Sequence, residues 1–366
     1  MFNLPMALIE CSPTTFSRNS IDSRTALSMV SDASEVLRIL LEGGRSTVAG
    51  RLAGAFRNIG RTRIADDILA TMRDAGYKVT ESDPFDDKLD IDLPPRERSP
   101  YVNRIKLMWQ KMRQPVIDVF GKAPGIPTDH QAYLKAVEEI YVTDAYHSLS
   151  IEKYRVSQEL IERVRAGQWD TQKNEEDKKQ RDAMAARGYY LAFEKVKDSI
   201  SSILVGNNPG KVADDDHGSW YRELFSPSVA AGILNAADLA GYRGHQVYIG
   251  GSKHTPLNVD AVRDAMPTLF ELLRQEPEAS VRAVLGHFIF VFIHPYGDGN
   301  GRMGRFLMNV MLASGGYPWT VIPVQERDEY MAALEKASVE QNIGPFAEFL
   351  AYLVSRTMKG EPVAKI

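Results

Sequence analysis

The sequence is nearly devoid of cysteine, since Cys11 is its one thiol in 366 residues. A single cysteine excludes an internal disulfide framework and is typical of a reducing compartment. No apolar run approaches the roughly 20 residues that a membrane-spanning helix needs. The apolar start MFNLPMALIEC has no basic region and is interrupted by Pro5 and Glu10, so we do not expect a signal peptide. These absences favour a cytoplasmic protein with no membrane partner.

An excess of either charge is also lacking, because 44 Lys and Arg face 48 Asp and Glu for a formal net charge of −4. This balance disfavours a molecule-wide surface for nucleic acid or membranes and leaves room only for a local basic patch. Internal repeats and low-complexity tracts are absent from the sequence as well. A chain of this length can form two domains.

The first hundred residues are expected to hold a small helical domain, over residues 1–95. Residues 1–32 show no clear periodicity and are expected to form an arm. Apolar side chains then follow helical spacing from Glu35 to about Gly76, with a stop at Gly43-Gly44. The acidic, proline-rich stretch 80–100 is predicted to be a linker or a wrap-around segment.

Five arginines and no acidic residue lie between Arg45 and Arg63. This segment has some likeness to a DNA-binding helical module. It is also consistent with a docking or self-association domain, and with a plain packing domain that has a solvated basic face. We favour the last of these, so nucleic acid is an unexpected partner, while a homo-oligomer stays an open alternative.

Beyond Tyr101 nearly all of the chain has a helical pattern. We predict a helical segment over 101–188, with one helix at about 140–165. The best strand signal is GHQVYIGGSK, which predicts a β-hairpin at about 244–255 with Val247, Tyr248 and Ile249 on one arm.

The stretch IHPYGDGNGRMGRFLMN, from Ile293 to Asn309, has the composition of a chemical site. Pro295 ends an apolar helix on one side, and a second helix is predicted from Arg302 to Ser314. The glycines between them tolerate the positive φ angles of a tight turn.

A glycine-rich turn that enters a helix directs backbone N–H groups at one point, which is an anion site. Arg302 and Arg305 are three residues apart and share a helix face, so both can reach the same phosphate. Asp298 supplies a hard oxygen for Mg²⁺, and His294 can take a proton from a hydroxyl. Each fragment alone would suit an ordinary turn and helix cap, but together they indicate phosphate-ester transfer.

HPYGDGNGRMGR resembles the signature of the Fic family, with Tyr296 where phenylalanine is usual. The resemblance extends over about Tyr189–Thr357, which we predict to be the catalytic core, 189–357. It implies a mainly α fold, a Fic-type helical bundle with a β-hairpin flap, here preceded by a small helical domain. It also implies transfer of AMP from ATP to a Ser, Thr or Tyr hydroxyl of a target protein, with Mg²⁺. The presence of Asn300 and both arginines argues against the Doc-like branch, which transfers phosphate.

The resemblance also assigns roles to residues. His294 would be the general base and Asp298 the Mg²⁺ ligand. The anion nest and the phosphate-binding side chains would be Gly299, Asn300, Gly301, Arg302 and Arg305. The segment with Val247, Tyr248 and Ile249 would be the flap that docks the target by main-chain pairing. Tyr330, with Leu334 four residues on, would line the adenine pocket, although the same spacing suits plain core packing.

The stretch HSLSIEK resembles the inhibitory helix of Fic proteins, in which Ser or Thr precedes Glu by four residues and Gly or Asn follows. Ser148 and Glu152 match this pattern, whereas Lys153 departs from it. Glu152 paired with Arg305 would occupy the arginine that the γ-phosphate needs. The alternative is an ordinary glutamate on the surface of an amphipathic helix.

We therefore expect an autoinhibited, Mg²⁺-dependent protein AMP transferase that acts on a target or on itself. The rivals are a transferase of another nucleotide or a de-AMPylase, and a DNA-binding regulator with an ATP-sensing Fic region. A further rival is a metal phosphohydrolase built on His287, His294 and Asp298, which has few additional ligands at metal spacing.

Overall fold

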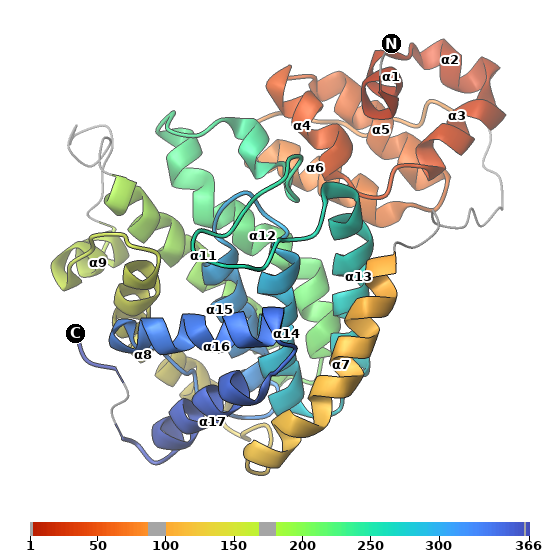
Figure 1. The fold of residues 1–366 in the computed structure, drawn as a ribbon. Coiled ribbons are helices and arrows are strands. Elements are labelled where there is room, and N and C mark those ends of the chain that lie inside the picture. The colour runs from red at the N-terminus through yellow and green to blue at the C-terminus, as the bar shows by residue number, and fades with distance from the viewer. Residues whose placement is uncertain (1–2, 87–99, 168–180, 362–363) are drawn as a thin grey trace. The chain divides into compact units, whose positions relative to one another are not determined.

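The computed structural model describes residues 3–86, 100–167, 181–361 and 364–366 (Figure 1). Every regular element in these ranges is a helix, and none of their residues is in a strand. The predicted mainly α fold is thus confirmed. The chain divides into two compact units, and each is described by itself.

The first unit consists of residues 3–86 together with Gly232–Gly244. Its helices are α1 (Leu4–Glu10), α2 (Pro13–Arg18), α3 (Ser20–Ser28), α4 (Ser34–Glu42), α5 (Ser46–Asn58), α6 (Thr62–Asp74) and the short 3₁₀ helix η1 (Ala236–Ala240). The prediction of an irregular arm over residues 1–32 was wrong. Leu8, Phe16 and Leu27 from α1–α3 are buried in the core of this unit. Helices of six to nine residues are too short for a period of 3.6 to stand out.

An extended segment, residues 79–86, follows α6 and packs along α5. The Ser82 amide donates to the Gly50 carbonyl (3.1 Å). A Cβ on Gly54 would lie 2.2 Å from the Ser82 carbonyl oxygen, so only glycine admits this approach. Phe85 is buried edge-on to Phe16, with 5.8 Å between ring centres. The predicted linker therefore begins as part of the core, and its continuation over 87–99 lies outside the described residues.

The remaining piece of this unit comes from far along the sequence. Helix η1 packs on α4, and Ala237 and Ala240 join the same hydrophobic core. The Arg38 guanidinium donates to the Tyr242 carbonyl (3.4 Å). Nothing in the sequence pattern indicated that Gly232–Gly244 leaves the second unit's stretch of chain for the first.

The five arginines between Arg45 and Arg63 all have partners within this unit. Arg45 pairs with Glu10, and Arg57 with Glu81 (2.7 Å) and Asp66 (2.7 Å). The other three contact backbone carbonyls or a neighbouring acid: Arg51 with Ile9 and Cys11, Arg61 with Ser28, Arg63 with Asp67. Three of the five arginines are thus paired with acids, and the other two are hydrogen-bonded to backbone carbonyls.

The second unit holds the remaining helices. They are α7 (Pro100–Val119), α8 (His130–Ile151), α9 (Gln158–Arg165), α11 (Arg181–Leu204), α12 (Pro209–Ala230), α13 (Val259–Gln275), α14 (Ala279–Ile293), α15 (Asn300–Ala313), the 3₁₀ helix η2 (Val324–Glu326), α16 (Arg327–Val339) and α17 (Gly344–Met358). Helices α14 and α15 pack against each other, and nearly all of their residues are buried. They form the centre of this unit, with the other helices around them (Figure 1).

The helix predicted at about 140–165 is two helices. Helix α8 ends at Ile151, where the Lys153 amide donates to the Ser150 carbonyl and the Tyr154 amide to the Leu149 carbonyl. These two bonds make a Schellman motif, which requires a left-handed residue after the cap. Lys153 takes that conformation, with φ of 65°. Ser157 then caps α9 through its side chain, so residues 152–157 form a break that we call the exit segment.

The predicted β-hairpin at 244–255 is absent from the described chain. A turn does form at Gly250-Gly251, closed by the Ser252 amide on the Ile249 carbonyl (3.1 Å). The two arms are joined through the Gln246 side chain, which donates to the Pro256 carbonyl (3.0 Å). Pro256 has no N–H to donate, so a regular ladder cannot continue at that position.

Within the described ranges, no helix combines the length and the apolar character that a membrane span requires.

Candidate active site

The motif turn, residues 294–301, joins the end of α14 to the start of α15. His294 ends α14 in the left-handed region, with φ of 55°. The Asn300 side chain closes the turn on itself, because its Oδ1 accepts from the Tyr296 amide and its Nδ2 donates to the Tyr296 carbonyl (both 2.9 Å). The Tyr296 ring is buried and stacks on Tyr221, with ring centres 3.8 Å apart. Asn300 thus stabilises the turn with its side chain, and only its backbone is left for an anion.

His294 is partly exposed, and its tautomer is set by the turn. Its Nδ1 lies 3.2 Å from the Val291 carbonyl oxygen. A carbonyl oxygen only accepts, so Nδ1 carries a proton, and in the neutral ring Nε2 then carries the lone pair. The geometry therefore suits Nε2 as a proton acceptor.

Helix α15 begins in the motif turn, and its first N–H groups have no acceptor within the helix. Gly299 has φ of 81°, and a Cβ there would lie 2.9 Å from the Phe225 ring. A Cβ on Gly301 would lie 2.2 Å from the Glu152 carboxylate, so this carboxylate already rests against the helix start. The backbone of the turn is suited to an anion, and a side-chain carboxylate lies against it.

Arg302 is a buried cation with unsatisfied atoms. Its Nε and Nη2 are buried, and neither has a hydrogen-bond partner among the residues that the structure describes. Its guanidinium carbon lies 5.1 Å from the ring centres of both Tyr154 and Phe225. The nearest acid is Asp298, with 3.5 Å between Arg302 Nη2 and Asp298 Oδ2. A buried guanidinium in this state is suited to an incoming anion.

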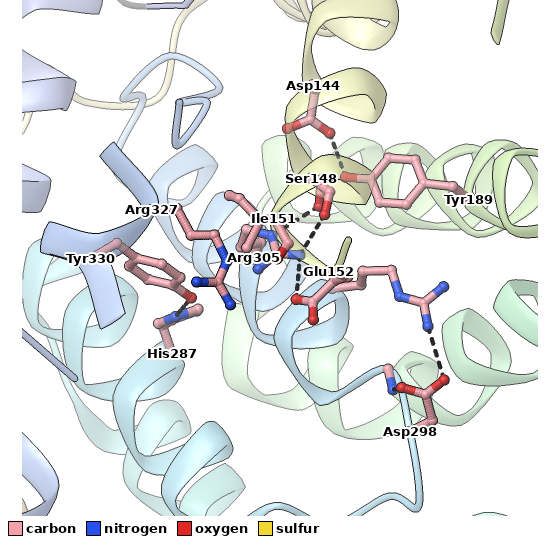
Figure 2. A network of polar contacts seen from close by, with 12 residues as sticks. Asp144, Ser148, Ile151, Glu152, Tyr189, His287, Asp298, Arg305, Arg327 and Tyr330 are labelled. Atoms are coloured by element: carbon pink, nitrogen blue, oxygen red, sulfur yellow. Dashed lines mark hydrogen bonds and ion pairs between the residues drawn. The ribbon is translucent and has the colours of Figure 1, made fainter. Parts of the chain in front are cut away.

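Arg305 is buried too, but helix α8 engages it (Figure 2). Its Nε donates to Ser148 Oγ (2.8 Å), and its Nη2 donates to the Ser148 carbonyl (3.0 Å) and to Glu152 Oε1 (2.9 Å). Burial alone would lower the pKa of Arg305, but the Glu152 carboxylate and nearby tyrosines outweigh this and raise it. The structure thus brings together the two halves of the predicted inhibitory pair, 153 residues apart in sequence.

One turn before Ser148, Asp144 extends this network. The Tyr189 hydroxyl on α11 donates to Asp144 Oδ2 (2.6 Å), and both side chains are buried. Burial raises the pKa of Asp144 to about 6, although the Tyr189 hydroxyl and the Arg305 charge oppose the rise. Asp144, Ser148 and Glu152 follow a spacing of four and lie on one face of α8 (Figure 2).

Tyr330 lies in the core and is covered on both sides. Its hydroxyl is 2.8 Å from His287 Nε2, and its ring packs against Phe346 and Phe349. Burial lowers the pKa of His287 to about 4 and raises that of Tyr330 to about 12, so the pair is neutral. At 1 % exposure, the Tyr330 ring offers no open face to an adenine.

The flap residues Val247 and Ile249 are half-buried, and Tyr248 is exposed. Their segment is tied down at its far end: Glu335 accepts from the Lys253 amide (2.8 Å), and His254 Nε2 lies 2.8 Å from the Phe292 carbonyl. Phe292 immediately precedes Ile293 and His294. The segment is therefore tethered beside the motif turn.

A resident metal cluster is not formed by the described side chains, because no three of their His, Cys, Asp or Glu groups converge. His287 is buried on Tyr330, which removes a ligand from the metal phosphohydrolase reading. Asp298, with a side chain 64 % exposed, stands alone beside the anion site. One accessible carboxylate next to phosphates suits Mg²⁺, which often takes one or two protein carboxylates and completes its shell with phosphate and water.

Three residues near the site were not predicted from the sequence. Tyr154 and Phe225 cover Arg302, and the Arg327 guanidinium donates to the Ile151 carbonyl (2.9 Å) at the end of α8. Their contacts depend on packing between residues that are distant in sequence, so no local sequence pattern predicts them.

Comparisons with known proteins include the motif turn. Residues 217–312, which include the whole motif turn, match the Fic/DOC family. Protein adenylyltransferase Fic of Nematostella vectensis is 26 % identical over 70 % of this chain and 56 % of its own length. The Drosophila virilis protein of the same name is 38 % identical over 32 % of this chain and 24 % of its own. The chain thus spans little more than half of the first of these relatives and about a quarter of the second.

Two solved structures share the fold. Fic-1 from C. elegans has a TM-score of 0.52 at 17 % identity and covers 89 % of this chain and 90 % of its own. A Fic domain containing signaling protein from Bacteroides thetaiotaomicron has a TM-score of 0.50 at 16 % identity over 72 % of this chain and 99 % of its own. Residues 217–312 are thus similar to the Fic/DOC family, and the fold of the chain is similar to that of these two structures.

Proposed function

We propose that this protein is an autoinhibited AMP transferase, which moves AMP from ATP to a hydroxyl of a target protein or of itself. The motif turn and the start of α15 carry the proposal: together they hold His294, a helix start whose first N–H groups lack acceptors within the helix, and the two buried cations Arg302 and Arg305. The relatives named protein adenylyltransferase support the choice of reaction.

In the proposed reaction, His294 Nε2 takes the proton of the acceptor hydroxyl. The hydroxyl oxygen forms a bond to the α-phosphorus of ATP, the bond from that phosphorus to the bridging oxygen breaks, and pyrophosphate leaves. The helix start at Gly299–Gly301 and the Arg302 guanidinium hold the negative charge that develops on the phosphates. Most of the rate enhancement then comes from positioning and electrostatics, because the fixed turn needs no rearrangement.

Asp298 would hold Mg²⁺ beside the phosphates. When bound, the ion neutralises phosphate charge and orients the leaving group. The chain itself contributes the exposed Asp298 carboxylate to this site, and the ion pair with Arg302 holds that carboxylate at the turn.

The resting state would be inhibited by Glu152. Its carboxylate lies against Gly301 and takes the Nη2 of Arg305, so both the helix start and one phosphate-binding arginine are engaged. A carboxylate in these positions competes with a phosphate for the same donors. We infer that ATP binds productively only after Glu152 is displaced.

The proposal is tested with ATP labelled at either the α- or the γ-phosphate. The Glu152→Gly chain is incubated with each label, alone and with a mixed protein extract, and Glu152→Gly/His294→Ala is the matched control. We expect protein to gain the α-label only, and only with His294 present. Transfer of the γ-label would identify a phosphotransferase instead, and ATP binding without transfer of either label would identify a sensor.

A further inference from the structure

Arg302 is covered by the same short segment that engages Arg305. Tyr154 lies two residues after Glu152 in the exit segment, and its ring centre is 5.1 Å from the Arg302 guanidinium carbon. The other side chain over this cation is Phe225, which belongs to helix α12 and is fixed in the core. Tyr154 is only half-buried, and the Arg181 guanidinium carbon lies 5.2 Å from its ring centre, so it is the more accessible of the two rings over Arg302.

The backbone explains how one segment reaches both arginines. Lys153, between the two side chains, has φ of 65° and forms the left-handed step of the Schellman motif. This step reverses the chain at the end of α8, and Glu152 then contacts Arg305 while Tyr154 contacts Arg302. An ordinary helical continuation would place residues 152 and 154 on different faces.

The state of Arg302 indicates what the ring replaces. Two buried guanidinium nitrogens, Nε and Nη2, make no hydrogen bond in the described chain, and the ion pair of Nη2 with Asp298 is long, at 3.5 Å. An aromatic face attracts a cation but accepts none of its hydrogen bonds in full. Phosphate oxygens would satisfy both nitrogens, so the ring holds the cation in a state that a triphosphate can improve.

We propose that Tyr154 is a second inhibitory residue, whose ring covers Arg302 while Glu152 holds Arg305. The exit segment then blocks both phosphate-binding arginines at once, and a bound triphosphate must displace the ring as well as the carboxylate. This inference rests on the proposed function, since it takes Arg302 to be a phosphate ligand.

The test is calorimetric binding of ATP and of adenosine to the full chain, with Tyr154→Ala, Tyr154→Leu and Tyr154→Phe. Loss of the ring is expected to lower the Kd for ATP about three- to tenfold, the range of one cation–π contact. Tyr154→Phe keeps the ring and should bind ATP as the wild type does. Adenosine has no phosphate for Arg302, so its affinity should be equal in all four proteins.

The same Tyr154 series in the Glu152→Gly background separates inhibition by Tyr154 from inhibition by Glu152. An additional gain in ATP affinity on removal of the ring supports Tyr154 as an independent arm of the inhibition. The inference is overturned if Tyr154→Ala and Tyr154→Leu bind ATP no more tightly than wild type, or if Tyr154→Phe behaves as they do. If Glu152→Gly itself fails to bind ATP, the proposed function is overturned and this inference with it.

Discussion

At the scale of single residues, two non-glycine positions in left-handed conformations frame the site. His294 ends α14 at φ of 55°, and Lys153 follows α8 at φ of 65°. The left-handed region costs an ordinary residue about 1–2 kcal/mol. At His294 this conformation places the imidazole at the turn, whereas at Lys153 it sets the direction of the exit segment.

Replacing Lys153 with glycine is expected to stabilise the protein. Glycine removes the strain but loses about 0.5–1 kcal/mol through its freer unfolded chain, which leaves a net gain of up to about 1.5 kcal/mol. The midpoint of thermal unfolding should rise accordingly. Lys135→Gly is the matched control, because Lys135 is an exposed residue within α8 and should lose about 1 kcal/mol. Equal losses in both variants would show that Lys153 carries no strain.

Replacing Glu152 with glycine is expected to raise adenylyl transfer about tenfold or more, because a buried arginine loses its competing carboxylate. Glu152→Gln keeps the length without the charge and should fall between the two. Glu139→Gln is the control, since Glu139 is an exposed acid elsewhere on α8 and should leave the initial rate unchanged. A rate in Glu152→Gly equal to wild type counts against the brake.

At the scale of elements, α8 contributes both to the proposed inhibitory contacts and to a buried carboxyl that affects stability. Asp144 and Ser148 lie on one face of α8, and Glu152 follows at its C-cap; they contact Tyr189 on α11 and Arg305 on α15. The buried Asp144 carboxyl has a pKa of about 6, above its ordinary 3.8, so the folded state favours its protonated form. The protonated Asp144 carboxyl therefore adds to the free energy of unfolding in full below about pH 4, and this contribution is lost as the pH rises through about 6.

Asp144→Asn is therefore expected to become more stabilising, relative to wild type, as the pH rises. The amide oxygen still accepts from Tyr189, while the cost of burying a charge disappears. The gain in the free energy of unfolding over wild type should be near zero at about pH 4 and reach about 2–3 kcal/mol at about pH 8. Urea unfolding at several pH values measures it, with Asp118→Asn on the exposed side of α7 as control. A difference that is independent of pH would contradict the raised pKa.

Packing of α5 against the extended segment 79–86 requires a glycine at position 54. A Cβ on Gly54 would meet the Ser82 carbonyl at 2.2 Å, and backbone cannot yield as a side chain can. Gly54→Ala should therefore destabilise the first unit by about 2–3 kcal/mol. Gly218→Ala in α12 meets only the flexible end of Arg222, so its effect should be neutral or mildly stabilising. Similar unfolding midpoints for the two variants would exclude a tight contact at Gly54.

How far the elements could be predicted depended on their length and on local signals. Helices α14 and α15 were foreseen because apolar periodicity meets Pro295 and a glycine cluster between them. Helices α1–α3 were missed because each is too short to show a period. The hairpin was predicted from β-forming residues and a Gly-Gly turn, yet Pro256 and the Gln246 side chain replace the ladder.

For the site, too, only the residues with a local sequence signal could be predicted. The motif turn is a local sequence feature, so its residues could be named in advance. The cover over Arg302 and the partner of Asp144 come from helices more than 40 residues away in sequence, and the pattern holds no sign of them.

At the scale of the whole molecule, the chain order and the spatial units differ. Gly232–Gly244 belongs to the first unit although it lies within the sequence range that resembles the Fic core. A fragment ending near residue 95 would lack η1 and its contacts with α4. Experiments on the first unit therefore require the full chain.

The central claim is that this chain transfers AMP and that Glu152 restrains it. The most direct test is the intact mass of wild type, Glu152→Gly and Glu152→Gly/His294→Ala after incubation with ATP and Mg²⁺. The account predicts a gain of one or more adenylyl groups in Glu152→Gly, little or none in wild type, and none without His294. Equal masses for all three proteins before and after incubation, in a sample that binds ATP and labels no added protein, would contradict it.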